Sequence, residues 1–264
     1  MPREQMRIQI RLFAMLRERV GESSLELGLP AGATVEDALT ALAADERLGG
    51  LLGRLPVRMA VNRDYAAPET VLHGGDELAL IPPVSGGAEG DPFAGAGAGV
   101  DPNAGGAQAV GVVHVRVCAE LLSLDRLLAA VADPGAGAVV VFQGVTREVE
   151  RLEYEAYVEM ARERIERILL DCIRRHGLRA AAAEHRVGDV PRGEPSVIVA
   201  VSSAHRDAAF AGAREAIDRI KAEAPIWKRE HGEGGPAQWL AGTPAPTGTV
   251  ADPAATATAP AESG

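Results

Sequence analysis

The stretch Asp76-Glu77-Leu78-Ala79-Leu80-Ile81-Pro82-Pro83-Val84-Ser85-Gly86-Gly87 closes the first half of this 264-residue chain. Its apolar residues predict a strand, and the prolines and glycines that follow end it. A terminal pair of glycines makes a slim tail, because glycine lets the backbone approach other groups closely. Gly86-Gly87 is internal here, and residues 88–111 are rich in glycine and alanine. The sequence therefore predicts a first domain at 1–87, a flexible linker at 88–111 and a second domain beyond it.

The residues before this tail predict a small sheet crossed by one helix. Runs 7–13 and 24–29 alternate between polar and apolar residues, which is the period of a half-buried strand. Two further strands are predicted at 57–61 and 77–81. Thr34 precedes apolar residues at helical spacing and fits the N-cap position of a helix. The predicted order is strand, strand, helix, strand, strand.

The second domain is predicted at 112–240, with strands and helices alternating. An apolar run over 137–147 is typical of a strand buried on both faces, and it ends at Arg147. The apolar stripe of an amphipathic helix at 160–175 includes Cys172, which we interpret as a small core residue. A last helix over 204–223 ends before Pro225, and residues 241–264 predict a disordered tail. The fold class is therefore α+β.

Composition limits the partners that we expect. A net charge of −10 argues against a nucleic-acid partner, whose phosphates require a basic surface. No stretch approaches the roughly 20 apolar residues of a membrane span, and no signal-peptide pattern is present, so we expect no membrane and a cytoplasmic protein. The two cysteines, Cys118 and Cys172, are too few for a disulfide framework or a thiolate metal site. We expect neither a metal nor a cofactor.

Charged residues gather at both ends of the last predicted helix. His205 and Arg206 lie in its first turn, where free N–H groups and the helix dipole favour an anion. Lys221 lies in its last turn, and Lys228 follows Pro225. Two ammonium groups in one pocket depress each other's pKa, which would let one act as an acid, base or nucleophile. Each residue alone also fits a plain surface role, in which Lys221 complements the helix C-terminus.

The first domain resembles the β-grasp sulfur-carrier proteins, relatives of ubiquitin, and among them the small subunit of molybdopterin synthase. Leu12-Phe13-Ala14, Val61-Asn62 and the tail at 76–87 carry the resemblance, which spans 6–87. In that family the terminal glycine is adenylated and converted to a thiocarboxylate, so no cysteine is needed. The resemblance implies that Gly86 and Gly87 form the carrier terminus and that an adenylating, sulfur-loading enzyme is a partner.

The second domain resembles the large subunit of molybdopterin synthase over 115–239. The matching stretches are 137–147, 152–157, 201–206 and 220–230. The resemblance implies an α/β hammerhead-like fold, a homodimer through this domain, and sulfur transfer to cyclic pyranopterin monophosphate that gives molybdopterin. It also implies that Lys221 and Lys228 are the catalytic pair, and that Arg147, His205 and Arg206 bind the substrate.

Two features depart from the family pattern. The loop after Arg147 is only Glu148-Val149-Glu150-Arg151, whereas the family has a longer polar loop, so Arg147 could be displaced and Arg151 could take part of its role. The internal Gly86-Gly87 has an amide where the carrier needs a carboxylate, which predicts a processing protease as a partner. One alternative is a non-catalytic binding or regulatory fusion whose Gly-Gly is never activated, and another is a thiamine-type carrier that serves a different enzyme.

Overall fold

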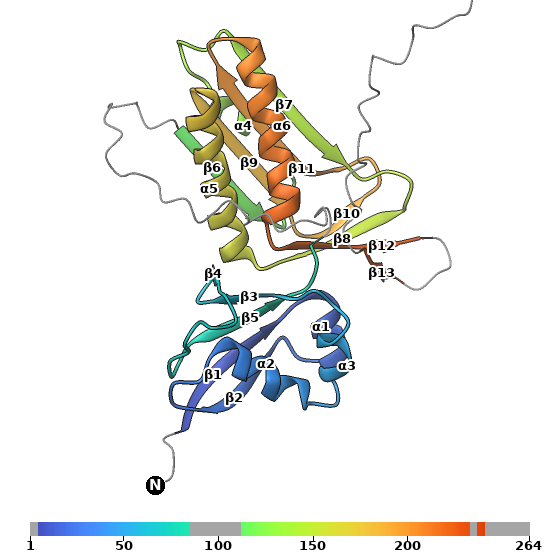
Figure 1. Ribbon diagram of the computed structural model, residues 1–264. Helices are drawn as coiled ribbons and strands as arrows, with labels where there is room; N and C mark the ends of the chain where they lie inside the picture. The colour runs from blue at the N-terminus through green and yellow to red at the C-terminus, as the bar shows by residue number, and fades with distance from the viewer. Residues whose placement is uncertain (1–4, 85–111, 233–236, 241–264) are drawn as a thin grey trace, which may run out of the picture.

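The structure, a computed structural model, describes residues 5–84, 112–232 and 237–240, which form two units (Figure 1). The N-terminal unit comprises 5–84, and the C-terminal unit comprises the described residues from 112 onward. The predicted linker at 88–111, the tail at 241–264 and the pair Gly86-Gly87 lie outside the described residues. No helix within the described ranges is long and apolar enough to cross a membrane.

The N-terminal unit is a five-stranded sheet in the order β2-β1-β5-β3-β4. The central strand β1 pairs antiparallel with β2 and parallel with β5, which brings the tail-bearing strand beside the start of the chain. Its elements are β1 (Gln5–Leu12), α1 (Ala14–Val20), β2 (Ser24–Pro30), α2 (Val35–Ala43), α3 (Gly49–Leu52), β3 (Arg58–Val61), β4 (Asp64–Tyr65) and β5 (Glu77–Ile81).

The predicted order of this unit is confirmed, with short elements added. Thr34 caps α2 as predicted: its side chain accepts from the Asp37 N–H, while the Asp37 carboxylate accepts from the Thr34 N–H. The prediction missed α1, because its seven residues carry too few apolar positions for helical periodicity to stand out. Gly21 ends α1 at φ 80°, a left-handed conformation that favours glycine.

The C-terminal unit contains two four-stranded sheets, in the orders β6-β9-β11-β7 and β10-β8-β12-β13. Three helices accompany them: α4 (Leu124–Ala130), α5 (Val158–His176) and α6 (Arg206–Glu223). The strands are β6 (Val112–Cys118), β7 (Ala138–Val145), β8 (Arg151–Ala156), β9 (Ala180–Arg186), β10 (Gly188–Pro191), β11 (Pro195–Ser203), β12 (Ile226–His231) and β13 (Gln238–Trp239).

Helices α5 and α6 cover one face of the sheet β6-β9-β11-β7, and α4 covers the other (Figure 1). Cys172, on the buried face of α5, is fully buried in the core, as predicted. The prediction that 137–147 is buried on both faces is wrong for this chain. Strand β7 is an edge strand of which one face alone packs on the core: Val140 and Phe142 lie against the core under α5 and α6. Val139 and Val145, on the opposite face, are 47% and 42% exposed.

The two units contact each other through a shared apolar cluster. Phe13 of the N-terminal unit stacks on Tyr157 and Trp227 of the C-terminal unit, with ring centroids 5.0 and 5.1 Å apart. Ion pairs surround this stack: Arg17 lies 2.9 Å from Glu155, Arg63 lies 2.9 Å from Glu163, and Arg167 lies 3.0 Å from Asp64. Two of these pairs are largely exposed and contribute little in water, and in the third the burial of Glu155 offsets the attraction, so the buried rings supply most of the stabilisation.

We predict that Phe13→Ala separates the two units without unfolding either. Truncating a buried phenylalanine costs about 3–5 kcal/mol, and here the lost contacts join the units. Small-angle X-ray scattering should show a larger radius of gyration, and the emission of buried Trp227 should shift to the red. Val71→Ala, at an exposed site of the same unit, is the control. An unchanged radius together with unchanged emission would contradict the assigned interface.

Candidate active site

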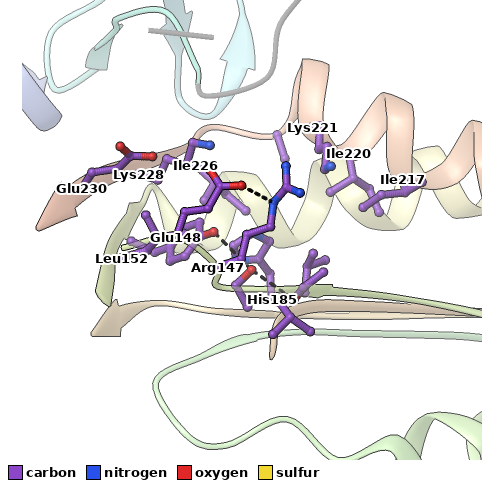
Figure 2. A pocket seen from close by; sticks show the side chains of 16 residues that line it. Arg147, Glu148, Leu152, His185, Ile217, Ile220, Lys221, Ile226, Lys228 and Glu230 are labelled. Carbon is purple, nitrogen blue, oxygen red and sulfur yellow. Dashed lines mark hydrogen bonds and ion pairs between the residues drawn. The ribbon is translucent and has the colours of Figure 1, made fainter. Parts of the chain in front are cut away.

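A pocket of about 320 Å³ lies where the two sheets of the C-terminal unit meet the C-terminal end of α6 (Figure 2). Apolar side chains from α6, β8, β11 and β12 form much of its wall, and charged side chains stand among them. The lining residues are Gly144, Val145, Arg147, Glu148, Leu152, Tyr154, His185, Ser196, Val197, Ile217, Ile220, Lys221, Ala224, Ile226, Lys228 and Glu230.

Two lysines meet at this pocket. Lys221 comes from the last turn of α6, and Lys228 comes from β12, which starts directly after Pro225 ends the helix. Lys221 Nζ lies 5.4 Å from the centre of the Phe142 ring. The sequence contains no other lysine. Apart from the histidines, all of its other basic side chains are arginines. Apart from the chain's N-terminus, the amines that can lose a proton are therefore both at the pocket.

Arg147 also lines the pocket, just beyond the end of β7. Its side chain is 84% exposed and lies 3.7 Å from the Glu148 carboxylate, a weak pair that leaves the guanidinium available to a ligand. Arg151 instead bonds Asp189 at 3.1 Å and His231 at 3.1 Å, and it does not line the pocket. The short loop therefore leaves Arg147, rather than Arg151, beside the two lysines.

His205 and Arg206 lie at the opposite end of α6. His205 occupies the N-cap position, and the exposed Arg206 side chain makes a loose 3.7 Å pair with its neighbour Asp207. The 16 residues from His205 to Lys221 rise roughly 24 Å along the helix axis. One chain thus brings Arg147, Lys221 and Lys228 together and leaves His205 and Arg206 outside the pocket.

The sequence analysis missed His185, Tyr154 and Ser196, which form a polar wall of the pocket. The Tyr154 hydroxyl donates to Ser196 Oγ at 3.1 Å, and Ser196 Oγ donates to the Gly144 carbonyl at 3.4 Å. Burial, assisted by the nearby Lys221 ammonium, lowers the pKa of His185 to about 4, so the ring is neutral at physiological pH. The sequence signal was a single histidine near the end of an alanine-rich strand, which is too weak to assign alone.

A cluster that could hold a metal lies away from the pocket. Glu153, Asp189 and His231 place their ligand atoms within 4.8 Å of one another. Burial raises the pKa of Glu153, but hydrogen bonds from Arg229 and His231 outweigh it and lower the pKa. Since Arg151 bonds Asp189, a cation would have to displace two guanidinium groups. We therefore interpret this cluster as an ion-pair network.

The tail of the N-terminal unit is held by the strand that also lines the pocket. Trp227 Nε1 donates a 3.0 Å hydrogen bond to the Pro82 carbonyl, and Val84, the last described residue of this unit, is buried. Trp227 immediately precedes Lys228, and alternate side chains of β12 point to opposite faces of its sheet. One strand thus holds the tail on one face and lines the pocket on the other.

Comparison with protein families gives a match for each unit. The model of the family described as MoaE protein matches residues 117–223. The model of the ThiS family matches residues 10–87.

Curated relatives named molybdopterin synthase catalytic subunit are similar to about half of the chain. One from Pyricularia oryzae is 40% identical over 55% of this chain and 82% of its own length. One from Homo sapiens is 42% identical over 44% of this chain and 65% of its own length. One from Oryza sativa subsp. indica is 45% identical over 41% of this chain and 60% of its own length.

Solved structures match the two units separately. The crystal structure of molybdopterin synthase from Staphylococcus aureus is 34% identical, with a TM-score of 0.45, over 47% of this chain and 94% of that one. The crystal structure of SAMP1 from Haloferax volcanii is 38% identical, with a TM-score of 0.27, over 31% of this chain and 99% of that one.

Proposed function

The chain belongs to the family of molybdopterin synthase catalytic subunits, and on this premise we propose that it is a sulfurtransferase that makes molybdopterin in the cytoplasm. The proposed substrate is cyclic pyranopterin monophosphate. The sulfur comes from a thiocarboxylate on Gly87, loaded by a separate adenylating enzyme. We propose a carrier domain at 1–87 and a catalytic domain at 112–240. The observation that carries the proposal is that Lys221 and Lys228 share a pocket on one face of β12, whose other face holds the carrier tail.

The position of the tail supports delivery of sulfur to this pocket. Gly87 follows Pro82 by five positions in the sequence, and the Pro82 carbonyl accepts a hydrogen bond from Trp227. Five extended residues span at most about 18 Å, so Gly87 stays close to the strand that carries both Trp227 and Lys228. We propose that Gly87 delivers its sulfur to the side of β12 that carries Lys228.

The charges at the pocket suit two anionic reactants. A phosphate ester and a thiocarboxylate repel each other, and fixed cations offset that repulsion most effectively where water is excluded. Arg147 can bind phosphate through its guanidinium fork, whereas a lysine amine can also donate and accept protons. We therefore assign anion binding to Arg147 and proton transfer to the two lysines.

We predict that Lys221→Arg and Lys228→Arg each lower turnover by about 100-fold or more, although both variants keep the positive charge. General acid–base catalysis contributes 10²–10⁴-fold, and a guanidinium does not give up its proton. Molybdopterin formation should be measured with separately supplied thiocarboxylated carrier. Arg214→Ala, an exposed change on α6 outside the pocket, is the control. Rates near those of the unaltered protein from both lysine variants would defeat the assignment.

We also propose that the enzyme is a homodimer in which one chain's His205 and Arg206 serve the other chain's pocket. The length of α6 keeps these residues about 24 Å from Lys221 of their own chain. The apolar edge strand β7 favours association, because an exposed edge of this kind pairs readily with another chain.

Complementation between two inactive variants tests this arrangement. Lys221→Ala and Arg206→Ala chains should each be nearly inactive alone. Random dimers from co-expression should recover about a quarter of the activity of the unaltered protein, because half the dimers are mixed and each mixed dimer has one intact site. Arg206→Ala alone should weaken substrate binding, since it removes charge from an anion site. If mixing restores nothing while Arg206→Ala alone is inactive, the shared site is wrong.

The carrier must also be released before it can be loaded. Within an uncut chain the Gly87 carbonyl belongs to an amide, which cannot be adenylated or converted to a thiocarboxylate. The order of events that we propose is cleavage after Gly87 by a protease, loading of the new carboxylate, and docking of the carrier through the Phe13 contact.

We predict that an uncleavable chain is inactive by itself and is rescued by a separate carrier that ends in Gly-Gly. Gly87→Pro should block cleavage, and intact mass should verify that the chain is uncut. Residues 1–87 supplied in trans should then restore molybdopterin synthesis. Full synthesis by a demonstrably uncut chain would exclude the need for cleavage. Failure of the carrier to restore activity would favour the non-catalytic alternative.

A further inference from the structure

His185 is placed at the pocket by the alternation of β9. Ala181, Ala183 and His185 point to the face covered by α5 and α6, whereas Glu184 points to the face covered by α4 and bonds Arg126. His185 pairs in register with Val197 of β11, and its side chain lies beneath the C-terminal end of α6. It is only 8% exposed, yet it lines the pocket beside Lys221 (Figure 2).

The surroundings of the imidazole select one tautomer. Nδ1 lies 2.8 Å from the Arg186 carbonyl oxygen, and a carbonyl only accepts, so Nδ1 carries the hydrogen. The Tyr154 ring packs edge-on against the imidazole at 5.1 Å, which fixes the plane of the ring. Because the ring is neutral, Nε2 retains its lone pair as an acceptor.

This acceptor is unused within the described part of the chain. Nε2 has no hydrogen-bond partner there, although the residue is more than nine-tenths buried. Arg147 and the two lysines offer only donors, and Tyr154 and Ser196 bond to each other and to the Gly144 carbonyl. Nε2 is thus an oriented acceptor that faces the pocket and is open to a donor from a ligand.

The pocket around Nε2 suits a flat heterocycle. Ile217, Ile220 and Val197 line it with apolar surface. A Cβ added at Gly144 would lie 2.8 Å from Val197 Cγ1, so glycine keeps this part of the wall flat. A phosphate ester at neutral pH has no strong donor and goes to the cations, whereas a reduced pterin ring presents N–H groups at its edge.

We propose that His185 accepts a hydrogen bond at Nε2 from a ring N–H of the substrate, and so selects the reduced pterin while Arg147 and the lysines hold its anionic groups. This inference rests on the proposed function, because it concerns recognition of the same substrate. His185 is then a binding residue. An acceptor on the protein recognises the ring of the substrate, and cationic donors recognise its anionic groups.

A matched pair of substitutions isolates this hydrogen bond. In His185→Gln the side-chain oxygen can stand where Nε2 stood, whereas His185→Asn keeps a donor near the Nδ1 position and has no atom at Nε2. The dissociation constant of cyclic pyranopterin monophosphate from the full chain should rise about fivefold to tenfold in His185→Asn and less than threefold in His185→Gln. His176→Gln, on α5 and bonded to Glu215, is the control.

Nitrogen-15 NMR of the unaltered chain gives a readout that does not depend on how the variants fold. At neutral pH the His185 Nε2 resonance should have the position of an unprotonated nitrogen and move upfield when substrate saturates the pocket. The inference is overturned if that resonance does not move, or if His185→Asn binds as tightly as the unaltered chain.

Further outcomes distinguish an error in the role of His185 from an error in the proposed function. A free-state Nε2 resonance already shifted by a hydrogen bond, and relieved by Lys221→Met, would make the lysine the donor and overturn the inference. An unaltered chain that fails to bind the pterin at all would refute the proposed function itself. Tight binding that is equal in all variants would refute only the role of His185.

Discussion

The arrangement of the site depends on the two faces of the sheet β10-β8-β12-β13. Successive side chains of a strand point to opposite faces, so Trp227 and Lys228 are separated by the sheet although they are neighbours in the chain. Trp227 holds the Pro82 carbonyl, and Lys228 lines the pocket. A one-residue slip of β12 against β8 would exchange these roles, and the continuous register from Ile226 to His231 prevents such a slip.

The same sheet supplies a contact whose strength comes from rings rather than charges. Glu155 accepts a hydrogen bond from the Ala14 N–H at the start of α1, yet burial raises the pKa of this carboxyl despite the nearby Arg17. A carboxyl whose pKa is raised stabilises the folded state in its protonated form, and that contribution is lost as pH rises through the raised pKa. At neutral pH the Phe13, Tyr157 and Trp227 stack therefore does most to hold the two units together.

The distribution of basic side chains separates structural charges from reactive ones. Arginines make the ion pairs of the interface and of the cluster around Glu153, where a permanent positive charge and a planar fork suit carboxylates. The chain's two lysines are both at the pocket. A lysine ammonium can lose its proton, whereas a guanidinium keeps it. The pocket is therefore the place where a basic side chain can exchange a proton.

The sequence by itself determined the order of elements in the N-terminal unit, the Thr34 cap and the core position of Cys172, because each depends on local periodicity or capping. It placed Lys221 and Lys228 on either side of the break at Pro225, and the structure showed that they share a pocket. The distance between His205 and Lys221 could also have been predicted from the sequence, because the rise per residue of one helix fixes it. Only the tertiary structure placed β7 at an edge, recruited His185 and stacked Phe13 on Trp227. Those outcomes depend on which surfaces meet across more than 30 residues of chain, as Tyr154 meets His185 and Phe13 meets Trp227. The hydrophobic pattern along one element reports that a side chain is buried, but it does not report which surface buries it.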